Sequence, residues 1–269
     1  MYNPEARSRR RTKLRMGRMQ GGVTLIELMV STTIGILVIG AAMASMLLSR
    51  TASTTISDIS QLQQQGARAL RIMGTQIRQV GSVELVPSPG LTAVAFSSAF
   101  NGFNGGGAAV AGIDGAEGAP DTVSVSNQPA TTPRVEAQNR DCLGNNAPPG
   151  LAGIRLDSTF FLARNGELKC QGAGSSGAQA IAANVADLQA WYRVKIAGTN
   201  IQRLTAAEVT QADLWAAVRS VEICLDLQGN ETGYPGASVY TNCNGMAAQN
   251  NGRLHLLLRN VFDLRTQGS

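Results

Sequence analysis

One segment near the N-terminus constrains this chain of 269 residues more than any other. Between Met19 and Ser49 the only ionisable side chain is Glu27. Residues 28–48 form an apolar run of about 21 residues, close to the roughly 20 that a helix needs to cross a bilayer. The run therefore predicts a membrane-spanning helix.

The formal net charge of +5 comes from the residues before this run. Seven of the 23 basic residues lie before position 22, beside the single acid Glu5, and they are Arg7, Arg9, Arg10, Arg11, Lys13, Arg15 and Arg18. Residues 23–269 keep 16 basic and 17 acidic side chains, a net charge of −1. By the positive-inside rule the basic cluster places the N-terminus in the cytoplasm and predicts an exported body. Because the body is not basic, we expect no direct nucleic-acid partner.

Several explanations of this segment compete. A plain membrane anchor does not need Glu27, since a charge costs about 2.5–3.5 kcal/mol near the centre of a membrane helix and less near the interface. A carboxylate that reaches the interface without a partner is the simplest alternative for Glu27. A secretory signal peptide would be cut after Ala42-Met43-Ala44, before Ser45.

The start of the apolar run reads Gly22-Val23-Thr24-Leu25-Ile26-Glu27-Leu28. This string resembles the class III leader junction of type IV prepilins and of type II secretion pseudopilins. The resemblance implies that a prepilin peptidase cuts after Gly22, that Val23 becomes the N-methylated first residue, and that Glu27 is the fifth. Two positions depart from the family: Val23 replaces the usual Phe, and Ala44 stands where major pilins often have a helix-bending proline.

The chemistry of the cleaved junction suits Glu27. Cleavage leaves an ammonium group at Val23 inside the bilayer or a filament core, where a carboxylate of a neighbouring subunit can neutralise it. Glu27 would thus fix the axial register of an entering subunit, which is the best-attested use of a buried ion pair.

The helical pattern continues beyond the apolar run. From Arg50 to Val80 the sequence has no proline and repeats apolar or small residues at spacings of three and four: Ile56, Ile59, Leu62, Gly66, Leu70, Met73, Ile77 and Val80. The opposite face carries Asp58, Gln61, Gln64, Arg68 and Arg71. One helix over 23–80 would be about 87 Å long, membrane-spanning over 23–49 and amphipathic beyond.

Residues 81–269 predict a head of the α+β class. Residues 87–120 are rich in glycine and proline and predict a loop. Segments that alternate with period two predict an antiparallel sheet packed on the amphipathic half of the helix, and they lie at 123–125, 154–163, 188–196, 221–227 and 254–258. Thr205-Ala206-Ala207-Glu208 has the form of a capping box and predicts a short helix.

The four cysteines favour disulfides, because an exported head meets an oxidising compartment. Their positions are Cys142, Cys170, Cys224 and Cys243, and three connectivities are possible. Pairing in sequence order would close loops of 28 and 19 residues, each worth roughly 3 kcal/mol.

Metal and catalytic sites are not indicated. A zinc site is the alternative for the cysteines, but no C-x-x-C occurs and His255 is the only histidine. Asp114 and Asp121 suit a turn better than a calcium loop, because they lack the ligand spacing of an EF-hand. We expect no cofactor and no enzyme: His255 reads as a residue of a strand face, and Glu222 and Asp226 as acids that meet solvent.

A closer resemblance covers most of residues 17–260. The helix segment 62–81, the strand Thr159-Phe160-Phe161-Leu162-Ala163, the stretch 215–221 and Leu258-Arg259-Asn260 are similar to PilW-type minor pilins. This implies a subunit of a priming or tip complex that joins other minor pilins and the major pilin, with prepilin peptidase and the inner-membrane pilus assembly machinery as further partners. It also implies a single-pass inner-membrane protein with a periplasmic head, which then enters the pilus.

Two rivals stay open. A type II secretion pseudopilin of the J class shares the junction and the helix. A secreted periplasmic binding protein or enzyme, released by signal peptidase, belongs to a different class.

Overall fold

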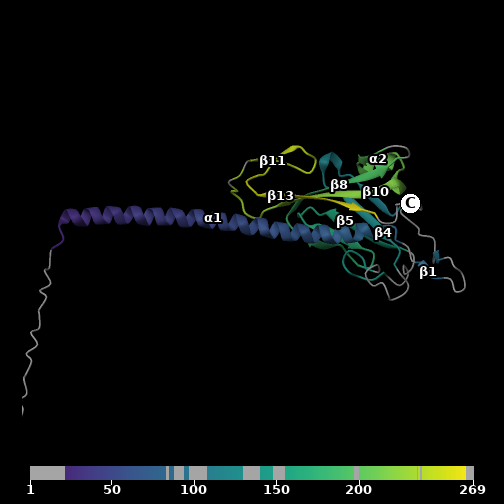
Figure 1. Ribbon diagram of the computed structural model, residues 1–269, viewed down its shortest axis with the longest axis horizontal. Coiled ribbons are helices and arrows are strands. Elements are labelled where there is room, and N and C mark those ends of the chain that lie inside the picture. Colours follow the sequence, from purple (N-terminus) through teal and green to yellow (C-terminus); the bar gives the residue numbers. More distant parts are fainter. Residues whose placement is uncertain are drawn as a thin grey trace, which may run out of the picture. The chain divides into compact units, whose positions relative to one another are not determined.

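The computed structural model describes residues 22–82, 85–87, 94–96, 108–129, 140–147, 155–196, 200–234, 236 and 238–264. The basic residues before Gly22 lie outside this part. The chain divides into two compact units, residues 1–51 and 52–269, here called the first and second units. Helix α1 (Leu25–Arg78), of 54 residues, contributes to both (Figure 1). It is the helix predicted over 23–80.

The second half of α1 buries one stripe of side chains in the second unit. The buried positions, which continue just past the end of α1, are Leu62, Gly66, Ala69, Met73, Gly74, Gln76, Ile77 and Val80. The predicted stripe is wrong at Ile56, which is 68% exposed, while the predicted Leu70 is half-buried and packs against the core beside the fully buried Ala69. The reason is the helical period of 3.6 residues, which turns Ile56 about 100° away from Met73.

Two antiparallel sheets complete the second unit. The five-stranded sheet runs in chain order through β3 (Val110–Ile113), β4 (Thr122–Asn127), β5 (Leu156–Leu162), β6 (Leu168–Gly172) and β7 (Gln179–Ala182). The four-stranded sheet has the order β13-β10-β8-β9, with β8 (Val185–Lys195), β9 (Ile201–Leu204), β10 (Val218–Gln228) and β13 (His255–Asp263). Shorter pairs are β1 (Leu85–Pro87) with β2 (Val94–Phe96), and β11 (Val239–Thr241) with β12 (Ala247–Gln249). The predicted α+β class is confirmed, with two main sheets in place of one.

The predicted loop over 87–120 is wrong in part. It contains β2, β3 and a 3-10 turn (Ala116–Gly118). Strand β3 forms because Val110 pairs with Val125 of β4 and Ile113 pairs with Thr122 of β4. This pairing is a tertiary contact that the glycine-rich composition of the segment does not indicate. Gly112 is required there, since a Cβ atom would collide with the hydroxyl of Tyr192.

The inner faces of both sheets and the buried stripe of α1 share one core. Phe160 of β5, Tyr192 of β8, Ile223 of β10 and Met73 of α1 are all fully buried in it. Close approach of α1 depends on glycine: a Cβ on Gly74 would overlap the ring of Phe262. The second half of α1 is therefore a core element of the second unit.

Helix α2 (Ala206–Gln211) confirms the predicted capping box. The hydroxyl of Thr205 accepts a hydrogen bond from the backbone N–H of Glu208 at 3.3 Å, and the Glu208 carboxylate accepts one from the Thr205 N–H at 2.8 Å. This pair closes the N-terminus of a helix too short to form alone.

Candidate functional site

The predicted cleavage junction lies just before the first turn of α1. Gly22 and Val23 have no regular secondary structure, and Val23 is 69% exposed. A Cβ on Gly22 would meet nothing within 4 Å. Both residues are exposed, and among the residues that the structure describes nothing obstructs the peptide bond between them.

Thr24 begins the helix, which the sequence reasoning missed. Its hydroxyl accepts a hydrogen bond from the Glu27 N–H at 3.3 Å, and its carbonyl accepts one from the Leu28 N–H at 3.1 Å. A threonine three residues before a glutamate is half of a capping box, a pattern readable from sequence.

Glu27 is an exposed carboxylate in the first turn of α1. A negative charge there is favoured by the helix dipole, by about 0.3–1 kcal/mol at an exposed site. Glu27 thus has a local role in starting the helix as well as the predicted role in register. The two roles require separate tests.

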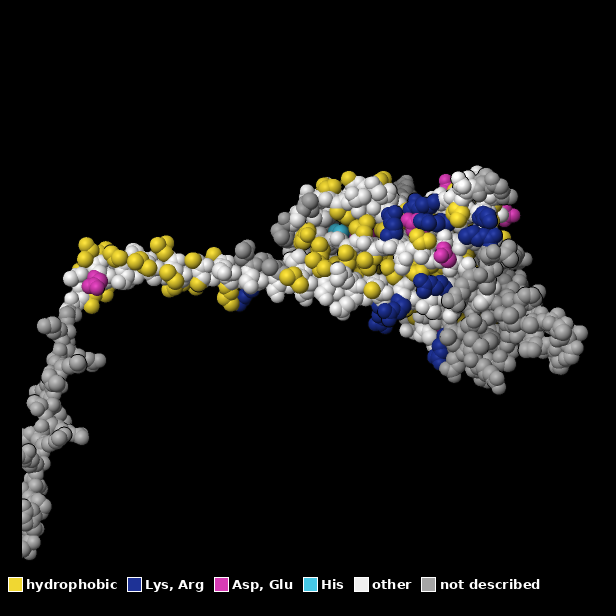
Figure 2. All heavy atoms as spheres, viewed as in Figure 1, with side chains coloured by type: hydrophobic (Ala, Val, Ile, Leu, Met, Phe, Trp, Pro, Cys, Tyr) yellow, Lys and Arg dark blue, Asp and Glu magenta, His cyan; other side chains and the backbone are white. Residues whose placement is uncertain are grey.

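The first half of α1 exposes its apolar side chains on all sides. The span Leu25–Leu47 has a mean hydropathy of 2.0, and none of it is buried. Figure 2 shows these apolar side chains along the visible face of the helix. The hydroxyls of Ser31 and Thr32 donate to helix carbonyls of Glu27 and Met29 at 2.6 and 3.0 Å. These hydroxyl groups therefore find hydrogen-bond partners within the helix. Polar groups in the hydrocarbon region of a bilayer need such partners, because no water is present there.

The four cysteines form two disulfides in sequence order. Cys142 pairs with Cys170, and Cys224 with Cys243, with Cα–Cα distances of 6.4 and 5.8 Å. The first bond ties the loop before β5 to β6, and the second ties β10 to the turn between β11 and β12. Among the described residues no three His, Cys, Asp or Glu side chains gather as metal ligands.

The outer face of the four-stranded sheet differs from the prediction. Glu222 and Asp226 were expected to meet solvent, but they are only 4% and 1% exposed. The sequence could not show this, because their cover comes from other strands and from the β11–β12 hairpin. Asp58 of α1 was also expected at a solvent face, and instead its carboxylate accepts a hydrogen bond from the Glu231 N–H at 3.4 Å.

Glu222 lies among three arginines. Arg193, Arg203 and Arg259 each place a guanidinium nitrogen within 3.2–3.3 Å of its carboxylate oxygens. Burial alone would raise the pKa of Glu222, but the hydrogen bonds from Arg203 and Arg193 and the nearby positive charges hold that pKa below its ordinary value.

Asp226 joins the hairpin to the sheet. The Tyr240 hydroxyl donates to its Oδ2 at 2.6 Å, and Nδ1 of His255 lies 2.9 Å from its Oδ1. The rings of Tyr240 and His255 stack with centroids 4.1 Å apart. Burial, together with the hydrogen bond to Asp226, raises the pKa of Tyr240. The His255 side chain is covered, at 8% exposure, and this arrangement fastens the hairpin to the sheet.

The carboxylate oxygens of Asp114 and Asp121 accept hydrogen bonds from backbone N–H groups. Asp114 accepts from Ala206 and Ala207 at 2.8 Å each and so caps α2. Asp121 accepts from Gly115 at 2.9 Å and Ala190 at 2.8 Å. Burial raises the pKa of Asp121, opposed by these two hydrogen bonds. Both aspartates therefore hold turns together, which is the role that the sequence favours for them.

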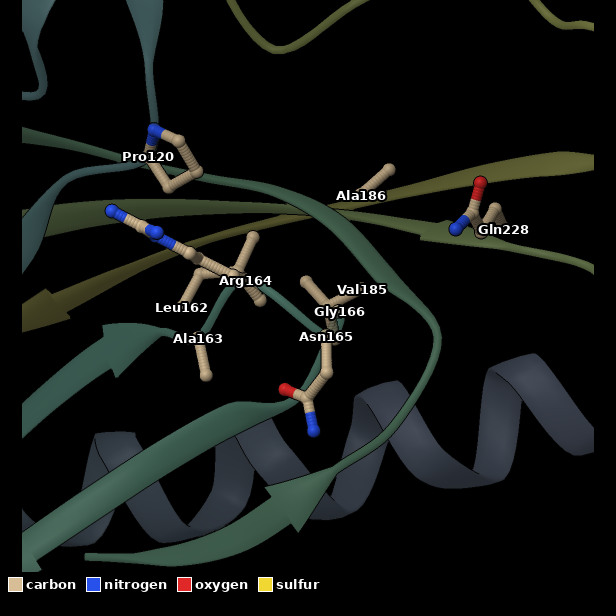
Figure 3. A pocket seen from close by; sticks show the side chains of 9 residues that line it. All are labelled: Pro120, Leu162, Ala163, Arg164, Asn165, Gly166, Val185, Ala186 and Gln228. Atoms are coloured by element: carbon tan, nitrogen blue, oxygen red, sulfur yellow. The ribbon is translucent and has the colours of Figure 1, made fainter.

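A hollow of about 600 Å³ opens beside the β5–β6 turn (Figure 3). Its polar side chains are Arg164, Asn165 and Gln228, and Arg164 extends towards Pro120. The lining holds no carboxylate or histidine, so it offers hydrogen bonds but no general acid or base.

No protein-family model matches the chain. No curated protein matches it in sequence. Among solved structures it is similar to the type IV-like pilin TTHA1219 from Thermus thermophilus, at 12% sequence identity and a TM-score of 0.41. That alignment covers 77% of this chain and 97% of the other.

Proposed function

We propose that this protein is a type IV pilin-like subunit, a minor pilin of the PilW type, which is built into a filament through its N-terminal helix. One observation carries the proposal. The fully exposed apolar span Leu25–Leu47 begins two residues after the accessible Gly22–Val23 bond and carries a single carboxylate, Glu27, in its first turn.

The assembly mechanism follows from this junction. The basic leader holds the N-terminus in the cytoplasm, the apolar half of α1 resides in the inner membrane, and the peptidase releases the leader after Gly22. The new ammonium group at Val23 then pairs with Glu27 of a neighbouring subunit as the apolar helices pack side by side. The head, on the periplasmic side, joins other minor pilins and the major pilin at the tip of the pilus.

The rival from another class fits the helix less well. Signal peptidase would cut before Ser45, which lies inside the unbroken helix α1. The pseudopilin rival shares the junction and the helix, so a genetic observation separates it: neighbouring genes for minor pilins and a tip adhesin favour the pilus, and genes for a secretion system favour the pseudopilin.

The mass of the mature protein tests the processing step. Protein purified from its host membrane should have the mass of residues 23–269 with one added methyl group. A chain that begins at Ser45 would contradict the proposal.

A pair of variants tests the role of Glu27. We expect Glu27→Gln to leave leader removal largely intact and to abolish or strongly reduce incorporation into pili, measured by immunoblot of sheared filaments. The matched control is Thr24→Ala, which removes the helix cap and keeps the carboxylate, and we expect it to retain incorporation. Equal incorporation of Glu27→Gln and the wild type would remove the register role, and equal loss in both variants would assign Glu27 to the start of the helix alone.

A further inference from the structure

Three arginines from different strands meet on the outer face of the four-stranded sheet. Arg193 of β8, Arg203 of β9 and Arg259 of β13 all contact Glu222 of β10. Their side chains are 42%, 41% and 45% exposed, whereas that of Glu222 is 5% exposed. Most of the negative charge is therefore covered, and the positive charge faces outward. These four residues are here called the arginine patch.

The patch carries more positive charge than Glu222 needs. One guanidinium neutralises one carboxylate, and the two further guanidinium groups repel each other at such short range. The period of the strands also places Lys195 and Asp263 on this face, and these two charges offset each other. Asp187 and Asp226 share the face as well, but they lie opposite each other four residues along β10 from Glu222, and Asp226 is engaged by Tyr240 and His255, so the positive excess lies around Glu222. Figure 2 shows Lys and Arg side chains gathered on the visible face of the second unit. The excess is open to a further anion.

Trp191 holds the guanidinium groups in place. Arg203 lies 3.8 Å from the centre of its ring, and Arg259 lies 5.3 Å from it. Arg259 is also fixed by a hydrogen bond of 2.7 Å that it donates to the carbonyl of Cys243. Guanidinium groups that are already ordered lose less conformational entropy on binding a ligand.

We propose that the arginine patch binds a carboxylate-rich segment of a partner protein. The planar fork of arginine matches carboxylate geometry, and Arg203 already shows it in this molecule: its Nε and Nη2 donate to the two oxygens of Glu222 at 3.3 Å each. The inference stands apart from the assembly role above, because it concerns the outer face of a sheet and neither the leader junction nor the apolar helix.

Nucleic acid fits this patch less well. Single strands bind through aromatic rings on which bases stack, and Trp191 is 8% exposed beneath its arginines. A nucleic-acid interface also needs an extended basic surface, whereas residues 23–269 carry a net charge of −1. A short acidic segment requires neither feature.

Binding of fluorescein-labelled hexaglutamate to the full chain in detergent tests the proposal, measured by fluorescence anisotropy at low salt. We expect saturable binding that weakens with added salt and that falls about fivefold in Arg193→Gln. The matched control is Arg155→Gln, which removes an arginine from the ion pair with Asp157 beside β5 and should leave binding unchanged.

Glu222→Gln gives a second test with the opposite sign. This variant removes the negative charge from the patch, so we expect tighter binding of hexaglutamate together with lower stability of the second unit. A purely structural charge network predicts no gain in binding. Absence of saturable binding, equal binding by Arg193→Gln and the wild type, or a single-stranded oligonucleotide of equal charge that binds more tightly with the same dependence on Arg193 would each overturn the proposal.

Discussion

Both halves of helix α1 carry apolar residues, yet the two halves bury them differently. None of Leu25–Leu47 is buried, while Leu62, Met73 and Ile77 in the second half are between 0 and 3% exposed. The second half has already gained its hydrophobic free energy from the two sheets. That of the first half is still available to surroundings outside the chain, such as lipid or the helices of other subunits. The same kind of residue therefore supports folding in one half and remains available for association in the other.

Matched methionine substitutions give the largest expected contrast between the halves. Met73 is 0% exposed and Met43 is 64% exposed. We expect Met73→Ala to lower the free energy of unfolding of the second unit by roughly 2–5 kcal/mol, because a cavity is left in the core. Met43→Ala should leave it unchanged.

Denaturant unfolding of the full chain in detergent, followed by tryptophan fluorescence, checks this contrast. Both tryptophans, Trp191 and Trp215, lie in the second unit, so the signal reports that unit alone. Equal effects of the two variants would mean that the halves do not differ as described.

Removal of a disulfide should lower the stability of the second unit alone, because both disulfides lie in that unit. The Cys224–Cys243 bond closes a loop of 19 residues, and loop entropy assigns it about 3 kcal/mol. We expect the double variant Cys224→Ala/Cys243→Ala to lower the free energy of unfolding by about this amount, measured in the same assay. The helix content of the first unit, followed by circular dichroism before the main transition, should stay constant. A stability equal to that of the wild type would show that the bond constrains nothing in the unfolded chain.

Sequence periodicity predicted some elements of the fold and missed others. Periods of 3.6 and 2 identified α1 and the strands at 188–196, 221–227 and 254–258, because these elements bury one face against one core. Strand β3 was missed, since it forms by pairing with β4 among glycines. The β11–β12 hairpin was missed because two strands of three residues each carry too little periodicity.

The polar clusters were harder to predict than the leader junction. Gly22, Val23 and Glu27 are neighbours in the chain, so their relation is visible in one string. The arginine patch draws on four strands, and Glu222 and Asp226 look like solvent-facing acids until β13 and the hairpin are placed beside them. When a charged side chain is buried by segments that are distant in the chain, the sequence around it shows no pattern that indicates the burial.

Two glycines provide a finer test of close packing along α1. A Cβ on Gly74 would overlap the ring of Phe262, whereas one on Gly40 would meet nothing within 4 Å. Overpacking costs about 1–3 kcal/mol, and alanine regains up to about 1 kcal/mol in a helix, so we expect Gly74→Ala to lower the free energy of unfolding by about 1 kcal/mol. Gly40→Ala should not change the unfolding of the second unit. A stabilising Gly74→Ala would mean that Phe262 moves aside without cost.

The pH should change the free energy of unfolding of the second unit, where the buried carboxylates lie. Substitution of Asp187 is expected to give the smallest change among the variants described. Burial raises its pKa above the ordinary value of 3.8, opposed by hydrogen bonds from Gln189 and Leu188, and the negative charge of Asp226 on the paired strand raises it further. A raised pKa in the folded state means that ionisation at pH 7 favours unfolding. Asp187→Asn keeps an acceptor for Gln189 and removes this cost, so we expect a small rise in the free energy of unfolding at pH 7, less than the change from Gly74→Ala.

The pH dependence of that rise identifies its cause. As the pH falls below the folded pKa, the wild-type carboxyl takes up a proton and regains stability, so the advantage of Asp187→Asn should shrink towards pH values of about 4 and vanish below the ordinary pKa. The control is Asp213→Asn at an exposed position with a φ of 53°, a backbone conformation that asparagine adopts readily, and it should show no such dependence. An advantage for Asp187→Asn that is constant with pH would assign the effect to packing or hydrogen bonding, and the charge of Asp187 would then have no part in it.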